Sequence, residues 1–276
     1  MLPFFEITYF SVGPLKIYTW GLFVGLAFTA GYFWVLRQAR KKGLDLNKII
    51  GLVSAIFFGA VIGSRVFFLL QEPKRWLADA SLLWRIDQGG LMIWGGIIGA
   101  ILAGWLYLRW VKLDFWEIAD LVTPALALGI AIGRIGCFLV NDHQGAATNL
   151  PWGILWPDGI VRHPVALYES SLGFLLFGFL LFLQEKIWSP GFSQRQSPPE
   201  GGTPKLKTGS IFLLFLISYS IIRFFLDFTR VATGPLADPR WWGLTTSQWI
   251  SLAIFLVCIF IIYVKNLFWQ KKVAEK

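Results

Sequence analysis

Charged residues are scarce in this chain, and their scarcity excludes an ordinary soluble fold. Only 15% of the 276 residues are charged, whereas 56% are hydrophobic and the mean hydropathy is +0.61. A soluble domain averages about 25% charged residues. This composition therefore leaves too little polar surface to face water, and we interpret the chain as an integral membrane protein.

Cysteine and histidine are also rare, with two of each. Cys137 and Cys258 both fall in apolar runs, and no Cys-x-x-Cys pair or Cys/His spacing suits zinc. The sequence therefore favours neither a disulfide framework nor a metal site, and we expect no cofactor. The net charge of +9 does not indicate a nucleic-acid partner, because the basic residues bracket apolar runs.

Seven apolar runs are long enough to cross a hydrocarbon core about 30 Å thick, which takes about 20 residues per helix. They cover residues 17–36, 49–70, 89–108, 118–140, 164–184, 209–229 and 246–265. The sequence thus predicts an all-α fold, with one polytopic membrane domain over residues 1–276. A Pro/Gly/Ser-rich stretch at 188–209 is typical of a flexible linker.

Basic residues between the runs predict how the chain is oriented. Most of them lie in alternate connections, at 37–48, 109–112, 186–207 and 265–276. The positive-inside rule assigns these connections to the cytoplasm. We therefore expect the N-terminus outside, the C-terminus and the 188–209 linker in the cytoplasm, and a multi-pass protein of the bacterial inner membrane.

Four arginines lie inside or at the ends of the runs. In the expected orientation Arg65, Arg134, Arg223 and Arg230 all fall toward the outer leaflet. An arginine at membrane depth is costly unless it faces protein, water or an anion. Because Asp227 and Glu169 are the only acids that the runs clearly offer as partners, we expect a surplus of positive charge. Arginine binds phosphate oxygens with a planar fork, so we infer a lipid-phosphate site, with an internal ion-pair network as the alternative.

Four segments carry a more specific signal. They are GRIGCFLVNDHQG at 133–145, RHPVALYES at 162–170, IIRFFLDFTR at 221–230 and GGLMIWGGIIG at 89–99. Together, and in their order along the chain, they resemble the prolipoprotein diacylglyceryl transferase family. The resemblance implies a seven-span fold, with phosphatidylglycerol and prolipoprotein signal peptides as partners in the lipid bilayer. It also implies transfer of a diacylglyceryl group to a cysteine thiol, with release of glycerol phosphate.

The resemblance also implies site residues. Arg134 matches the arginine of the family signature, and Arg223 matches the essential arginine of the sixth span. The remaining matches, with the substrate-binding role that we expect for them, are Asn141, Asp142, Gly145, Tyr168, Glu169, Asp227 and Arg230. We add Arg65 from its expected depth, and Trp94 as a possible lining of an acyl cavity.

The chain departs from the family pattern at three positions. Trp94 stands where the family often has a histidine proposed to handle the thiol proton, Trp20 replaces a tyrosine, and Cys137 replaces an asparagine. Gly95 and Gly99 form a GxxxG pair, for which helix packing is the expected role. The departures leave the acid/base assignment open, and a member of the family that has lost catalysis is an alternative.

The chemistry assigns different tasks to the polar residues. A free thiol has a pKa of about 8.5, so a base or a positive potential must raise its thiolate fraction. We assign Arg134 and Arg223 to the phosphate, and His143 to the catalytic base or proton relay. For His163 we expect a structural role in the turn before the fifth run.

Two further classes of function compete with a transferase. An anion transporter or channel would also use arginines near one face, but it predicts polar residues through the inner halves of the runs. Those halves are almost uniformly apolar in the second, fourth and sixth runs. A lipid-binding protein without turnover is the second competing class.

Overall fold

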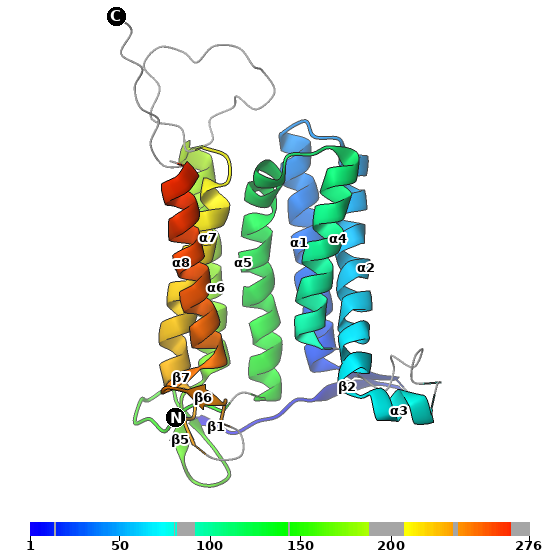
Figure 1. Cartoon of the computed structure of the whole chain (residues 1–276). Helices are drawn as coiled ribbons and strands as arrows, with labels where there is room; N and C mark the ends of the chain where they lie inside the picture. Colours follow the sequence, from blue (N-terminus) through cyan, green and yellow to red (C-terminus); the bar gives the residue numbers. More distant parts are fainter. Residues whose placement is uncertain are drawn as a thin grey trace, which may run out of the picture. The chain divides into compact units, whose positions relative to one another are not determined.

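The computed structural model describes residues 1–13, 15–79, 81, 92–142, 144–187, 207–233 and 237–265. Within these ranges, seven helices are long and apolar enough to cross a membrane, as the sequence predicted. They are α1 (Thr19–Lys41), α2 (Leu46–Gln71), α4 (Ile93–Val111), α5 (Phe115–Val140), α6 (Val165–Ile187), α7 (Ser210–Leu226) and α8 (Thr246–Lys265). Figure 1 shows them in the colours of the sequence. Most of the expected 188–209 linker lies outside the described residues.

Several helices begin or end where a local polar interaction replaces the missing helical hydrogen bond. Asp45 precedes α2 and accepts a hydrogen bond from the Asn47 amide at 2.9 Å. At the ends of α4 and α5, Lys112 and Asn141 adopt left-handed backbone angles, with φ of 56° and 51°. These residues stop the helices because a left-handed residue turns the chain away from the helix axis.

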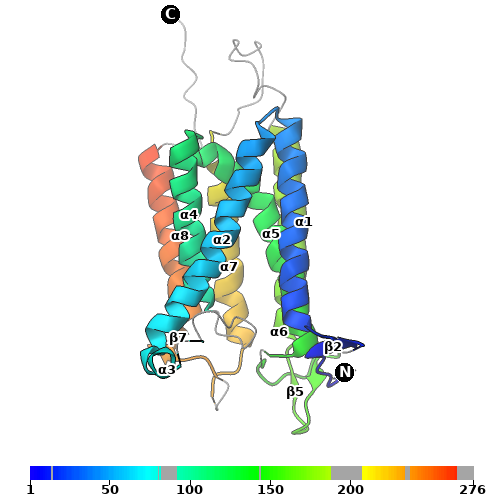
Figure 2. The same cartoon turned by 90° about the vertical axis from the view of Figure 1, so that its right-hand side faces the viewer.

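The remaining elements are short. They are β1 (Leu2–Pro3), β2 (Tyr9–Val12), β3 (Leu15–Tyr18), α3 (Pro73–Ala78), β4 (Ile154–Leu155), β5 (Val161–Arg162), the 3₁₀ turn η3 (Asp227–Thr229), β6 (Arg240–Trp241) and β7 (Leu244–Thr245). The strands pair in the orders β1-β4-β5, β2-β3 and β6-β7. Figures 1 and 2 show them gathered at one end of the helices to which they connect.

The chain forms two compact units, which we describe separately. The first unit comprises residues 1–35 and 119–276, and the second unit comprises residues 36–118. In the second unit α2 and α4 pack along a line of glycines. A carbon atom added to Gly99 or Gly63 would collide with the backbone of the facing helix, at Gly59 and Gly95 respectively. This close approach confirms the packing role expected for the Gly95 and Gly99 pair.

In the first unit α5, α6 and α7 share an apolar core around Ala127, Leu180 and Phe215. At one end of these helices, Asp120 of α5 binds the start of α7. Its carboxylate accepts hydrogen bonds from the amides of Gly209 and Phe212 at 2.6 and 2.8 Å, which caps the first turn of α7. The cap supplies acceptors for amides that an apolar environment would otherwise leave unpaired.

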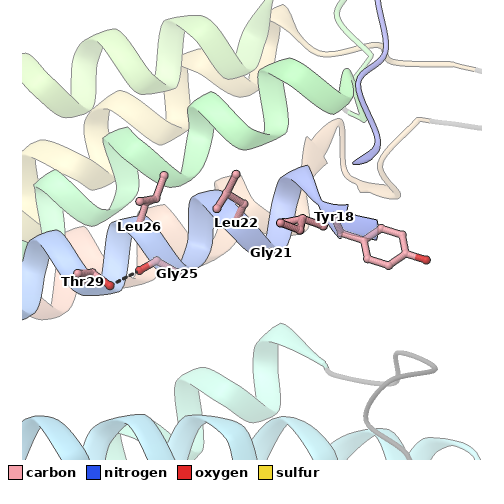
Figure 3. Close-up of a pocket in the computed structure, with 7 residues that line it drawn as sticks. Tyr18, Gly21, Leu22, Gly25, Leu26 and Thr29 are labelled. Carbon is pink, nitrogen blue, oxygen red and sulfur yellow. Dashed lines mark hydrogen bonds between the residues drawn. The ribbon is translucent and has the colours of Figure 1, made fainter. Parts of the chain in front are cut away.

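A groove runs along the face of α1, lined by small and aliphatic residues and by Tyr18 at one end. Figure 3 shows Gly21, Gly25 and Thr29 on this face together with Leu22 and Leu26. The Thr29 hydroxyl does not project as a free polar group, because it donates to the carbonyl oxygen of Gly25 at 2.8 Å. This bond lets a hydroxyl lie on an otherwise apolar helix face.

Candidate functional site

One buried carboxylate joins two of the arginines that the sequence singled out. Glu169 is 5% exposed, and its two oxygens pair separately with Arg134 and Arg223. Arg134 lies near the end of α5, Glu169 near the start of α6 and Arg223 near the end of α7. Three helices of the first unit therefore meet at one ionic centre, which brings Arg134 and Arg223 together.

A second carboxylate extends this centre to α8. Asp227 is fully buried and accepts hydrogen bonds from the hydroxyls of Thr245 and Ser247. Its other oxygen lies 3.1 Å from a terminal nitrogen of Arg223, and Ser247 also accepts from Arg223 at 3.3 Å. Because every partner comes from a fixed element, Asp227 holds the end of α7 against the start of α8.

Arg230 reaches the same centre by a route that the sequence did not predict. In a continuous helix the spacing of Arg223, Asp227 and Arg230 would place all three on one face. However, α7 ends at Leu226 and Arg230 is extended, with ψ of 153°. The helix tightens into η3 and stops there because the Asp227 side chain is bound by α8. Arg230 nevertheless lies 3.5 Å from Asp227 and pairs with Asp238.

The centre as a whole is electrically balanced. Arg134, Arg223 and Arg230 face Glu169, Asp227 and Asp238, so three positive groups meet three negative ones. The surplus of positive charge expected here is wrong for this cluster, because Asp238 lies in a connection and was not counted as a partner. Pairing lowers the cost of burying the charges, and it also means that an anion entering the centre must compete with a carboxylate.

A short loop beside the centre ties three chain segments together. The Ala146 amide donates to Thr229 at 2.8 Å, and the His163 amide donates to Ala146 at 3.0 Å. Gly145 forms a bridge with Arg230 in the middle of this arrangement. A side chain on Gly145 would collide with the main chain of His163, so only glycine fits here without displacing the loop.

The other residues of the signature segment lie around this loop. Asn141 ends α5, and its side-chain amide donates to the carbonyl oxygen of Phe5 at 3.3 Å. Asp142 is exposed, and His143 lies outside the described residues. Within the residues described, the geometry therefore gives Asn141 a structural contact, whereas the role expected for His143 stays a prediction.

Tyr168 belongs to a hydrogen-bonded chain, not to the ionic centre. Its hydroxyl accepts from the indole N–H of Trp152 at 2.8 Å and lies 3.2 Å from Nδ1 of His163. Burial lowers the pKa of His163 below its ordinary value, because the charged ring loses hydration. The pair fixes the turn that precedes α6, consistent with the structural role expected for His163.

Arg65 and Trp94 lie in the second unit. Arg65 of α2 is buried and its guanidinium stands over the ring of Phe68, 5.2 Å from the ring centre. Trp94 lies in the first turn of α4 and is about half exposed. The expected substrate contacts of these two residues stay predictions.

A narrow cavity opens beside the ionic centre, between α6 and α7. Glu169 and Arg223 lie at its polar end, and Leu172, Leu176 and Ile222 are among the residues that form its apolar walls. Its volume of about 10 Å³ is near the lower limit for one water molecule. The Glu169 carboxylate therefore lies at a boundary between paired charge and hydrocarbon.

Three polar partners in the centre were missed by sequence reasoning. Thr245, Ser247 and Asp238 precede α8 or begin it, in a segment that carries no family motif quoted above. The acid at Asp227, within a predicted membrane run, could have indicated such partners, because a buried carboxylate needs more hydrogen-bond donors than one arginine supplies.

Within the described ranges, seven helices long and apolar enough to cross a membrane, three of which meet at one ionic centre, define a polytopic membrane protein. Comparison with known proteins identifies the family. The model of the family described as prolipoprotein diacylglyceryl transferase matches residues 7–264, and the chain belongs to this family.

Three bacterial relatives cover almost the whole chain, and all three are named phosphatidylglycerol--prolipoprotein diacylglyceryl transferase. The protein of Legionella pneumophila (strain Corby) is 32% identical over 93% of this chain and 96% of its own length. That of Geobacter sulfurreducens is 31% identical over 92% and 93%. That of Idiomarina loihiensis is 32% identical over 90% and 88%. The predicted family is confirmed.

Proposed function

We propose that this chain transfers the diacylglyceryl group of phosphatidylglycerol to the lipobox cysteine of prolipoprotein signal peptides. The thiol sulfur attacks the glycerol carbon that carries the phosphate. The carbon–oxygen bond breaks, a thioether forms and glycerol phosphate leaves. Membership of the family and the names of the three relatives support the proposal.

The structural observation that carries the proposal is the meeting of Arg134 and Arg223 on one buried carboxylate at one end of apolar helices. Two guanidinium groups from different helices can bind the oxygens of one phosphate. Their fixed positive charge would also stabilise the charge that develops on the departing phosphate. Both arginines are therefore catalytic residues in this proposal.

Arg230 and Asp227 would support phosphate binding indirectly, because their ion pairs hold the end of α7, and with it Arg223, in a fixed position. Gly145, Asn141, Asp142 and Tyr168 would shape the headgroup side of the site, where Gly145 already bridges to Arg230. Arg65 and Trp94 of the second unit are proposed to contact the lipid as well. His143 is proposed to receive the thiol proton.

The distribution of basic residues supports a specific orientation. We propose that the N-terminus lies outside, that the C-terminus lies in the cytoplasm, and that residues 188–209 form a flexible cytoplasmic linker in one membrane domain. The ionic centre then lies toward the outer leaflet of the bacterial inner membrane. A signal peptide emerging on that side would meet the lipid phosphate there.

A lipid-binding member without turnover is the second candidate. The observation that favours it is Trp94, an aromatic side chain that cannot accept a proton, at the position where the family often has histidine. Such a protein would bind phosphatidylglycerol and leave the peptide unchanged.

The test is incubation of the purified protein with headgroup-labelled phosphatidylglycerol and a synthetic lipobox peptide. Transfer predicts a peptide mass gain of one diacylglyceryl unit together with an equal amount of labelled glycerol phosphate. Arg134→Ala and Arg223→Ala should each abolish both products. Arg37→Ala, an exposed arginine on α1, is the matched control and should retain them. Lipid binding without product would favour the second candidate.

A further inference from the structure

Glu169 and Asp227 are both buried acids in the ionic centre, but they are held differently. Asp227 has hydroxyl donors from Thr245 and Ser247 in addition to arginines. The partners described for Glu169 are Arg134 and Arg223, the two groups assigned above to the phosphate. Arg223 is shared between the two acids, but a ligand that displaced Glu169 from its arginines would leave the Thr245 and Ser247 donors of Asp227 in place.

The partners of Glu169 also suit a phosphate. A guanidinium group binds a carboxylate and a phosphate diester with the same fork of N–H donors. Glu169 presents one oxygen to each arginine, and a phosphate diester presents two oxygens in a similar way. The carboxylate thus occupies donors that the lipid would need.

We propose that Glu169 is a resident anion of the phosphate site, which yields Arg134 and Arg223 to the lipid phosphate and returns to them when glycerol phosphate leaves. This inference rests on the proposed function. It changes the role of Glu169 from a substrate contact to a positioning residue that competes with the substrate. In the empty site, Glu169 holds two like charges of different helices in place, which they could not do alone.

Charge balance and surroundings support the exchange. With three arginines and three carboxylates, the empty centre carries no surplus charge that would retain a bound anion. Arg223 is the one cationic residue among the described residues that line the cavity next to Glu169. A carboxylate displaced toward this cavity therefore gains no new cationic partner there. The displaced state is therefore less favourable, and the return of Glu169 to the arginines promotes product release.

The exchange predicts an effect with an unusual sign. Glu169→Gln keeps the size of the side chain and one acceptor oxygen, but removes the competing charge. Binding of glycerol phosphate should become about tenfold tighter or more. In the variant, Arg134 and Arg223 no longer have to break charge-assisted bonds to a carboxylate before they bind the phosphate. Loss of a substrate contact or of a structural tie would weaken binding instead. Under the proposed function, kcat should fall because product leaves more slowly.

The experiment measures the Kd of glycerol phosphate by calorimetry, with protein in lipid nanodiscs lacking phosphatidylglycerol. Wild type, Glu169→Gln and Arg223→Ala are compared, with Glu72→Gln as a control that removes an exposed acid of the second unit. Tighter binding only in Glu169→Gln supports the exchange. Unchanged or weaker binding in that variant overturns it. Absence of peptide modification by the wild type would overturn the proposed function alone, since the Kd comparison does not depend on turnover.

A structure of the wild-type protein in phosphatidylglycerol nanodiscs tests the inference even if Glu169→Gln does not fold. An antibody fragment would supply the mass needed for cryo-electron microscopy. We expect a phosphate on Arg134 and Arg223, with Glu169 released from at least one of them. A phosphate bound to these arginines while both Glu169 ion pairs persist would overturn the inference.

Discussion

Asp227 accepts a hydrogen bond from the hydroxyl of Thr245, a residue that lies directly before α8 and is itself buried. This contact joins the end of one membrane helix to the start of the next. It also shows that the acid at the end of α7 is a structural tie as well as a partner for arginine.

The first prediction concerns this tie. Asp227→Ala should lower the free energy of unfolding by about 3–5 kcal/mol, because it removes the fully buried carboxylate that Arg223 and Arg230 share and the acceptor of the Thr245 and Ser247 hydroxyls. Asp238→Ala removes a more exposed partner and should cost about 1 kcal/mol or less. Denaturant unfolding in detergent measures both. Equal losses for the two variants would contradict the buried role of Asp227.

The second prediction concerns the loop beside the ionic centre. Gly145→Ala should reduce peptide modification at least tenfold, because the added methyl group collides with the main chain of His163 and displaces the loop from Arg230. Gly178→Ala on α6 is the control, since an atom added there meets none of the residues that the structure describes. Comparable activity of the two variants would show that the close approach of Gly145 to His163 is not needed for peptide modification.

The third prediction concerns pH. Burial lowers the pKa of His163, so between that value and the ordinary pKa of about 6.5 the unfolded chain binds more protons than the folded one. Stability contributed by the neutral ring is therefore complete above about pH 6.5 and falls as the solution is acidified. His163→Gln should flatten this part of the curve of melting temperature against pH. A curve unchanged by the substitution would refute the assignment.

The fourth prediction tests the glycine contact within the second unit. Gly99→Val should separate α2 from α4 and lower the melting temperature, because the facing backbone at Gly59 leaves no space for a side chain. Gly25→Val on α1 is the matched control, since within the described part of the chain an atom added at Gly25 has open space. Equal melting temperatures of the two variants would show that the close packing of α2 and α4 does not contribute to stability.

Helix number was predictable because membrane thickness fixes the length of an apolar run. The second predicted run, 49–70, corresponds to α2 at Leu46–Gln71, with a difference of a few residues at each end. The grouping of Arg134 with Arg223 was also predictable, because helices that run in the same direction place residues at equal depth at the same end. Both inferences depend on spacing along the chain alone.

Other features depend on contacts that spacing does not encode. Asp238 lies in a connection without periodicity, so its pairing with Arg230 had no signal in the sequence. The predicted run 209–229 agrees with the helical span Ser210–Thr229, but the change to the 3₁₀ turn η3 after Leu226 was missed, because it is set by the bond between Asp227 and Ser247 of α8. Tertiary bonds to a buried acid outweighed the local helical pattern.

The Asp120 cap has a consequence for any movement that admits a peptide. It binds the first turn of α7 at the end opposite to Arg223, and its carbonyl oxygen also accepts from Gln184 of α6 at 3.1 Å. With bonds at both ends, α7 cannot slide along its axis past α5 or α6 without breaking several of them together. Entry of a bulky polypeptide must therefore proceed by tilting of helices or by displacement of other segments, while α5, α6 and α7 keep their positions along one another.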